Sequence, residues 1–406
     1  MTLARPFSLI LMLVLFGCET SPEKPNIVEF LPFDQAAATL SGALSDQLAS
    51  NQSLLEKIGE STVVVDELID ADTGEATEAT KRVQDYLLAA GKQRKFNISR
   101  VTSDGLAKAQ YVVTGIIKYE TVPSAYGKGK AYRISVSVVN VKTALVVANR
   151  DTWVANKKIA NQPIGIYQNA PMYLKDAYTE AKIQTAQTPT GQPAAREYKE
   201  ALPTEALIAQ ADSLFEQGEY ARAVQLYRVV AARPDGRRMK LYAGLYQAYR
   251  KLNQLQEAEN AFSDLISQAV LENRVNIKFL FDVGAVNFYR GIDIAQDYPM
   301  WLRQLAKAVG SSGKCLKIIG HSSRSGTEQF NQQLSTQRAL HLQAILMAQI
   351  PDLERRSIAI GRGFKDNIIG TGTDDQQDAL DRRVEFQIQE CPLKQVQSGG
   401  DFHTTS

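Results

Sequence analysis

Apolar and polar residues alternate with two different periodicities over the first part of the chain. Residues 61–70 and 111–120 are runs of β-branched and other apolar residues that predict strands, and residues 79–92 between them have the spacing of an amphipathic helix. A hairpin follows, and its buried face is predicted to hold Ile134, Val136, Val138, Val146 and Trp153. The pattern therefore predicts a small α+β domain over residues 27–158.

The next stretch, residues 159–203, shows neither of these periodicities. It contains "QTAQTPTGQPAAREY", which is rich in Gln, Thr, Pro and Ala. Segments of this composition typically connect domains. We expect a linker here, with a short helix near Met172–Thr185.

Residues 204–272 return to a helical spacing and repeat themselves. Three positions recur one unit later: Ala223 with Ala258, Tyr227 with Phe262, and Gly218 with Asn253. This resembles tetratricopeptide repeats, in which small residues let two paired helices approach and aromatic residues fill the gap. Two interpretations remain open: a groove that binds a partner, or a helical spacer between two domains.

Residues 275–391 alternate between strand and helix patterns, in the order βαβαββ. This predicts a two-layer α/β domain. The tail "QSGGDFHTTS", within residues 392–406, has no apolar periodicity, and we expect it to be disordered.

The N-terminus has the proportions of a secretory signal. Residues 1–17 contain Arg5 and then an apolar core too short to span a bilayer, and Cys18 follows them. The junction resembles a bacterial lipobox, which implies acylation of Cys18, for example by palmitate, and a tether over residues 18–26. The alternative is a signal peptide that ends near a cysteine by chance. Glu19 favours the outer membrane by resemblance to bacterial sorting rules, with the remaining chain in the periplasm.

Composition narrows the function classes. The formal net charge is +2 at pH 7, with no basic run, so we expect no nucleic-acid partner. The three histidines lack a second ligand at useful spacing, and no nucleophile motif is present, so we expect no metal, no cofactor and no enzyme activity. Cys315 and Cys391 are a disulfide candidate in an oxidising compartment, and two buried free thiols are the alternative.

One charged residue stands out on an apolar stripe. In the helix predicted over residues 327–349, the positions three and four apart are Asn331, Leu334, Arg338, His341 and Ile345. A guanidinium stays charged at any accessible pH, so Arg338 must keep water or find an anion.

Four stretches of the C-terminal region stand in the order and spacing of the OmpA-like peptidoglycan-binding domain. They are "IKFLFDVGAVNFY", "GHSSRSGTEQFNQQLSTQRA", "IGRGF" and "DRRVEFQI". The resemblance implies peptidoglycan as a partner and places Arg338, Ser323, Asp381, Arg382, His321 and Asn331 at or near the binding cleft. In that family an aspartate and an arginine hold the amino and carboxylate groups of the diamino acid in the wall peptide.

This chain departs from the family pattern at one position. Ser323 stands where the family has aspartate, and a serine cannot neutralise an ammonium group. Losing a charge-assisted contact of about 1.5–3 kcal/mol would weaken binding roughly tenfold to a hundredfold. Arg338 could therefore bind wall peptide weakly, bind another anion, or pair internally with Asp381 or Glu328. His321 has an alternative interpretation as a residue that packs the loop. Arg382 and Arg383 have an alternative interpretation as a solvated end of a strand.

The N-terminal region resembles another group of bacterial envelope lipoproteins. The stretches "YVVTGIIKYE" and "ISVSVVNVKTALVVANRDTWVANKKI" are similar to the curli secretion channel lipoprotein, flagellar outer-membrane lipoproteins and the penicillin-binding-protein activator lipoprotein. Together the resemblances imply an outer-membrane lipoprotein that anchors the membrane to peptidoglycan and scaffolds periplasmic proteins. The alternative is a subunit of a secretion, motility or wall-synthesis machine whose OmpA-like domain is a degenerate docking module.

Overall fold

The computed structural model describes residues 29–52, 61–122, 129–156, 158–291, 293–367, 372 and 377–391. The predicted signal peptide, Cys18, the tether and the tail 392–406 lie outside these residues. Within the described residues, no helix combines the length and the apolar character needed to cross a bilayer.

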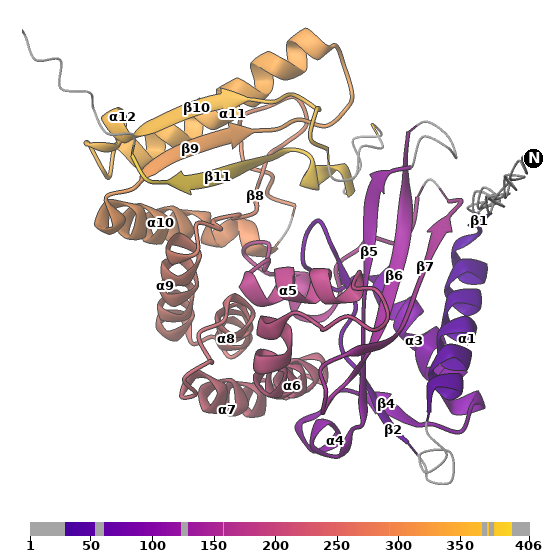
Figure 1. The fold of residues 1–406 in the computed structure, drawn as a ribbon. Coiled ribbons are helices and arrows are strands. Elements are labelled where there is room, and N and C mark those ends of the chain that lie inside the picture. The colour runs from indigo at the N-terminus through magenta and orange to yellow at the C-terminus, as the bar shows by residue number, and fades with distance from the viewer. Residues whose placement is uncertain are drawn as a thin grey trace, which may run out of the picture.

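The N-terminal unit is built on one mixed sheet. Its strand order is β1-β7-β6-β5-β2-β4, and β3 pairs with β5 (Figure 1). Strand β2 is parallel to β4 and β5, whereas β5, β6 and β7 form an antiparallel meander. The elements are β1 (Phe30–Leu31), α1 (Phe33–Asn51), β2 (Thr62–Val65), β3 (Ile69–Asp70), α3 (Glu78–Gln93), β4 (Asn97–Arg100), α4 (Ser103–Lys108), β5 (Tyr111–Thr121), β6 (Lys130–Asn140) and β7 (Val146–Val154).

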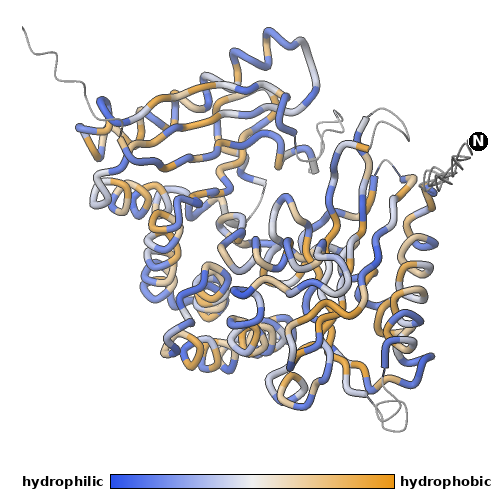
Figure 2. The backbone as a smooth tube through the Cα atoms, viewed as in Figure 1, coloured by the Kyte–Doolittle hydropathy of each residue, from blue (hydrophilic) through white to orange (hydrophobic). Residues whose placement is uncertain are grey.

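Alternation along these strands produces the core that the sequence predicts. The five positions expected on the buried face of the hairpin, Ile134, Val136, Val138, Val146 and Trp153, are all buried. Helices α1 and α3 pack on each other, and α1 covers β7. Figure 2 shows hydrophobic colours along these strands and a mixture of both colours along the helices, as expected for amphipathic helices.

The prediction of a linker over residues 159–203 is wrong, although a helix does form near the expected Met172–Thr185. This segment contains η1 (Gly165–Tyr167), α5 (Ala177–Ala186) and the start of α6 (Arg196–Glu216), and α5 packs on β5 and β6. The buried rings of Tyr178 and Tyr198 stack with centroids 5.6 Å apart. The polar composition misled because the few apolar side chains of the segment pack either against the sheet or against the helical hairpins.

Two helical hairpins occupy the region where repeats are predicted. They are formed by α6, α7 (Tyr220–Ala231), α8 (Met239–Lys251) and α9 (Leu255–Leu271). Gly218 and Asn253 occupy the two tight turns with φ of 79° and 56°, as their matching positions predict. The assignment to the tetratricopeptide family stays a prediction, since the hairpins alone do not establish it.

The C-terminal unit has helices packed against a four-stranded sheet of order β10-β9-β11-β8. Its elements are β8 (Phe279–Leu280), η2 (Asp293–Asp297), α10 (Tyr298–Ser312), β9 (Cys315–Gly320), α11 (Glu328–Met347), α12 (Leu353–Arg356), β10 (Ser357–Gly361), η3 (Gln377–Leu380) and β11 (Arg383–Gln389). The order of the main elements follows the predicted βαβαββ pattern, although β8 is very short.

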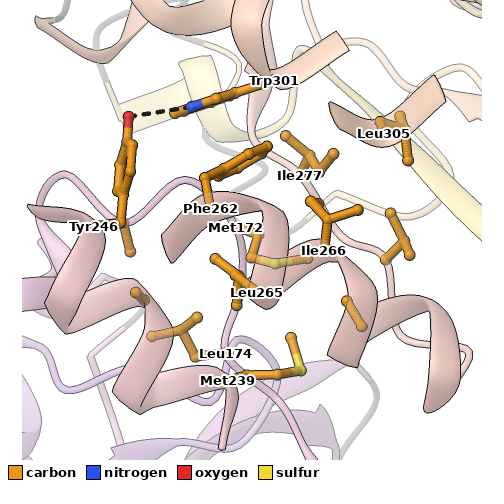
Figure 3. Close-up of a cluster of buried hydrophobic side chains, with 14 of the residues drawn as sticks. Met172, Leu174, Met239, Tyr246, Phe262, Leu265, Ile266, Ile277, Trp301 and Leu305 are labelled. Carbon is orange, nitrogen blue, oxygen red and sulfur yellow. Dashed lines mark hydrogen bonds between the residues drawn. The ribbon is translucent and has the colours of Figure 1, made fainter. Parts of the chain in front are cut away.

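The hairpins and the C-terminal unit share one continuous core. Trp301 of α10 is fully buried, stacks on Phe262 of α9 with ring centroids 5.4 Å apart, and donates its Nε1–H to the Tyr246 hydroxyl at 3.1 Å (Figure 3). Met172 and Leu174 lie in the same cluster, and Met172 bridges to Ile277 (Figure 3). The hairpins are therefore part of the molecular core, which does not fit a spacer that holds two domains apart.

Candidate functional site

The candidate site forms around the N-terminal half of α11, where several loops meet. Thr327 caps this helix by accepting a hydrogen bond from the backbone N–H of Phe330 at 3.2 Å. The Asn331 side chain donates to the carbonyl oxygens of Ser325 and Thr327, at 2.6 and 3.1 Å. These contacts hold the loop that carries Ser323 against the helix that carries Arg338.

Arg338 is fully buried and its guanidinium is held by backbone carbonyl groups from two loops. Nε donates to the carbonyl of Ala285 at 2.9 Å and Nη2 to that of Asp282 at 2.8 Å, both in the loop after β8. Nη1 donates to the carbonyl of His321 at 2.9 Å, in the loop after β9. The guanidinium carbon also lies 5.2 Å from the ring centre of Phe281. The orientation of the fork is therefore set by the protein itself.

The strand that leads into the site approaches α11 unusually closely. A Cβ atom on Gly320 would lie 1.8 Å from the carbonyl oxygen of Ser335, so only glycine fits at the end of β9. The next residues, His321 to Ser323, are buried, and the backbone N–H of Ser322 donates to the carbonyl of Gly363 at 2.9 Å. The first half of the loop after β9 is thus a packed part of the site, whereas Arg324 and Gly326 are exposed.

His321 lies beneath the site rather than at its surface. Its Nε2 is 3.5 Å from Oε2 of Glu385, and burial lowers the pKa of the imidazole. Burial alone would raise the pKa of Glu385, but hydrogen bonding from His321 and the charge of Arg383 lower it to about 2. The imidazole is therefore buried against the Glu385 carboxylate, which agrees with the loop-packing interpretation.

The start of β11 brings in three more charged residues. Asp381 is fully buried and accepts a hydrogen bond from the Asn367 side chain at 3.2 Å. Arg382 donates from Nε to the carbonyl of Phe281 at 3.1 Å, next to the loop that holds Arg338. Arg383 donates from Nη2 to Glu385 at 2.6 Å. The interpretation of the two arginines as a solvated strand end is wrong, because both are buried.

The structure brings the sequence-predicted site residues into one region. His321 accepts from Arg338, Arg382 braces the loop whose carbonyls hold Arg338, and Asn331 braces the loop of Ser323. Glu328 lies 3.6 Å from Lys365 at the surface. The sequence reasoning missed the carbonyls of Asp282 and Ala285, which no side-chain pattern could reveal. It also missed Glu385, although its alternation with Arg383 along β11 was a usable signal.

Cys315 and Cys391 form a disulfide that joins the start of β9 to the residue after the end of β11. The sequence left this pair open between a bridge and two free thiols. Among the described residues, no group of three or more His, Cys, Asp or Glu side chains could hold a metal ion.

No family model and no curated protein matches the chain. Over 27–28% of its length it is similar to solved OmpA-like and related envelope domains. The peptidoglycan-associated lipoprotein from Burkholderia pseudomallei is 21% identical, with 27% of this chain and 88% of that chain covered and a TM-score of 0.24. The cell wall anchor of the T6SS from Pseudomonas aeruginosa is 25% identical, with 27% and 73% covered and a TM-score of 0.22. The C-terminal domain of MotB from Helicobacter pylori is 14% identical, with 28% and 84% covered and a TM-score of 0.23.

Proposed function

We propose that this protein is an outer-membrane lipoprotein that binds peptidoglycan through its C-terminal unit and scaffolds periplasmic partner proteins. The observation that carries the proposal is the placement of Arg338, whose fork is oriented by three backbone carbonyls at the meeting point of two loops. A guanidinium in a fixed orientation is suited to a carboxylate of the wall peptide, because little side-chain entropy remains to be lost on binding.

The site is closed in this conformation, since Arg338 has no exposed surface. Peptide binding therefore requires a local rearrangement that exposes the guanidinium while the carbonyls of Asp282, Ala285 and His321 continue to hold it. Ser323 supplies a hydroxyl where an acidic side chain would attract the ammonium of the ligand. We expect weak binding at this site, which a lipid anchor would strengthen by confining the protein to the layer that holds the wall.

The experiment is co-sedimentation of the full chain with purified peptidoglycan. The excised residues 270–396 are unsuitable because Trp301 would lose its packing against Phe262. We compare the native protein with Arg338→Lys, which keeps the charge but not the planar fork, and with Ser323→Asp, which adds the missing charge. Arg228→Lys, at an exposed position on α7, is the matched control.

We expect native protein to pellet, Arg338→Lys to pellet about tenfold less well and Ser323→Asp to pellet better, since one charge-assisted contact is worth about 1.5–3 kcal/mol. Equal pelleting of native protein and Arg338→Lys would remove Arg338 from the binding site. If only Ser323→Asp pellets, the native chain does not bind the wall and the proposal fails.

Ser323 also favours a second candidate function. In it the protein is a subunit of a periplasmic secretion, motility or wall-synthesis machine, and its C-terminal unit docks onto a protein. Cross-linking in intact cells followed by purification distinguishes the two: a stable protein complex without wall material supports the machine subunit.

The lipid anchor is a separate part of the proposal. It rests on the sequence around Cys18, and its test is incorporation of labelled palmitate into the native chain but not into Cys18→Ser. An unlabelled native chain would remove the anchor and leave wall binding to be judged by co-sedimentation.

A further inference from the structure

An acidic loop that begins at the carboxyl end of β2 and includes β3 contacts three later segments of the chain. It spans residues 66–75 and carries Asp66, Glu67, Asp70, Asp72 and Glu75. Three of these carboxylates each contact a lysine from a different segment: Asp66 with Lys182 of α5 at 3.0 Å, Glu67 with Lys240 of α8 at 2.9 Å, and Glu75 with Lys278, just before β8, at 2.5 Å. The loop therefore joins the N-terminal sheet to α5, to the helical hairpins and to the C-terminal unit.

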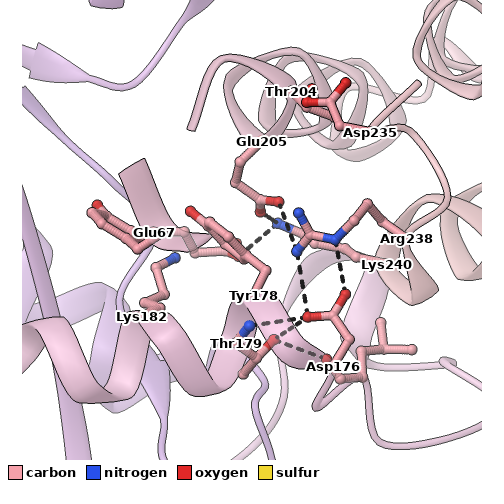
Figure 4. A network of polar contacts seen from close by, with 12 residues as sticks. Glu67, Asp176, Tyr178, Thr179, Lys182, Thr204, Glu205, Asp235, Arg238 and Lys240 are labelled. Carbon is pink, nitrogen blue, oxygen red and sulfur yellow. Dashed lines mark hydrogen bonds and ion pairs between the residues drawn. The ribbon is translucent and has the colours of Figure 1, made fainter. Parts of the chain in front are cut away.

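Other buried charged groups lie near Lys240, among them Glu205, Asp176 and Arg238 (Figure 4). Lys240 also lies 3.0 Å from both Glu205 and Asp212 of α6, and Arg238 pairs with Asp176, the cap of α5, at 3.0 Å. The buried carboxylates are Asp66, Asp70, Glu75, Asp176, Glu205 and Asp212, joined by half-buried Glu67; the facing cations are Lys182, Arg238, Lys240 and Lys278. The carboxylates outnumber the cations among these described residues.

Tyrosine hydroxyls complete the network without changing its charge. Tyr198 and Tyr178 donate to Asp66 at 3.1 and 3.3 Å, Tyr167 donates to Glu67 at 2.6 Å, and Tyr227 donates to Asp212 at 2.5 Å. Hydrogen bonds of this kind lower the cost of a buried carboxylate but do not neutralise it. A buried cluster with an excess of negative charge must take up protons or separate.

The pKa values show which carboxyl groups of the cluster bind protons most readily. Burial raises the pKa of Asp66, and it raises that of Asp70 to about 6 and those of Glu75 and Asp212 to about 7. Glu67 and Asp176 behave in the opposite way: burial opposes ionisation, but the charges of Lys240 and Arg238 lower their pKa values. The proton-binding groups therefore lie on the loop itself and on the facing helix α6.

We propose that the acidic loop Asp66–Glu75 is a proton-controlled joint, which holds the N-terminal sheet tightly against the rest of the chain in acidic medium and loosens as the medium becomes alkaline. A group whose pKa is raised by folding stabilises the closed joint while protonated, and that stabilisation is lost as pH rises through the raised pKa. Groups with lowered pKa values titrate below this range and do not oppose the effect. The proposal does not depend on wall binding.

The test is hydrogen–deuterium exchange of the full chain at pH 6 and pH 8, corrected for intrinsic exchange rates. The reporting segments are residues 164–176 and 275–281, which border the joint, and the internal reference is β6 within the N-terminal sheet. One proton taken up on closing changes the opening equilibrium about tenfold per pH unit, so protection of the reporting segments is expected to be at least about tenfold greater at pH 6. Protection of β6 should not change.

Two variants assign the effect to named groups. Asp212→Asn mimics the protonated form and keeps an acceptor for the Tyr227 hydroxyl, so the protection of its reporting segments should differ less between pH 6 and pH 8 than in the native chain. The difference that remains is due to Glu75 and Asp70. Glu75→Gln should reduce the pH dependence of residues 275–281 in particular, because it faces Lys278. Asp104→Asn, at an exposed position on α4, is the matched control and should behave as the native chain.

The outcomes separate clearly. Protection of the native reporting segments that is equal at both pH values overturns the joint. An unchanged pH dependence in both Asp212→Asn and Glu75→Gln also overturns it, since other groups would then be responsible. If Glu75→Gln fails to fold, Asp212→Asn alone decides the matter.

Discussion

Replacing Trp301 by alanine tests whether the hairpins and the C-terminal unit form one core. The indole is fully buried and contacts aromatic rings from two other segments: Phe262 at 5.4 Å and Phe279 at 6.1 Å between ring centroids. Its Nε1–H is a hydrogen-bond donor to Tyr246 at 3.1 Å. Because the surrounding residues come from α8, α9 and β8, no single element can move in to fill the space.

The size of the effect follows from these contacts. Truncation of a buried tryptophan to alanine costs about 3–5 kcal/mol, and the rigid aromatic surroundings place this site in the middle of that range or above it. The lost hydrogen bond to Tyr246 is part of this cost. Trp301→Phe keeps most of the ring contacts and should cost about 1–2 kcal/mol, from a smaller cavity and the lost hydrogen bond.

The assay is urea unfolding of the full chain, followed by far-ultraviolet circular dichroism for the helices. The chain has two tryptophans, so in both variants the fluorescence reports on Trp153 in the N-terminal sheet alone. Phe330→Ala, which truncates a half-exposed aromatic residue on α11, is the control and should cost less than about 0.5 kcal/mol. A loss below about 1 kcal/mol for Trp301→Ala would refute the shared core, since a tryptophan at a loose contact between independent domains would give that result.

Three further predictions concern the C-terminal unit. The Cys315–Cys391 bridge has a sequence separation of 76, so the double variant Cys315→Ser, Cys391→Ser should have a free energy of unfolding lower by about 4 kcal/mol. Urea unfolding without reductant measures this difference. No change would mean that the bridge does not constrain the unfolded chain. Gly320→Ala should destabilise the protein by about 3 kcal/mol or more, because the new Cβ would overlap the backbone of α11. The control Gly313→Ala lies at a helix end with φ of 65° and open space around it, and should cost about 1 kcal/mol. Equal melting temperatures of the two variants would contradict the close approach of β9 to α11. The lowered pKa of Glu385 contributes stability that is present above pH about 4.3 and is lost as pH falls towards 2. Acid titration followed by circular dichroism should therefore show a smaller loss of stability below pH 4 in Glu385→Gln than in the native chain. Identical acid unfolding curves for the two proteins would show that Glu385 does not contribute to acid stability.

The local pattern of apolar and polar residues was sufficient to predict an element wherever one of its sides is buried and the other is exposed. The hairpin of β6 and β7, the helix α3, the paired turns at Gly218 and Asn253 and the alternation of the C-terminal unit could all be predicted, because periodicity and turn chemistry depend on neighbours in sequence. The position of Arg338 on α11 could be predicted for the same reason. The segment 159–203 could not, since its isolated apolar residues are explained only by the surfaces they meet.

The amino-acid sequence by itself determined most of the elements outside residues 159–203 and the unusual arginine on an apolar stripe. Only the tertiary structure decided the long-range contacts: that backbone carbonyls hold Arg338, that Trp301 belongs to the same core as the hairpins, and that one acidic loop meets Lys182, Lys240 and Lys278. The physical reason is distance along the chain. Backbone carbonyls leave no mark in a side-chain pattern, and carboxylates and lysines separated by more than a hundred residues become partners only when packing removes water from between them.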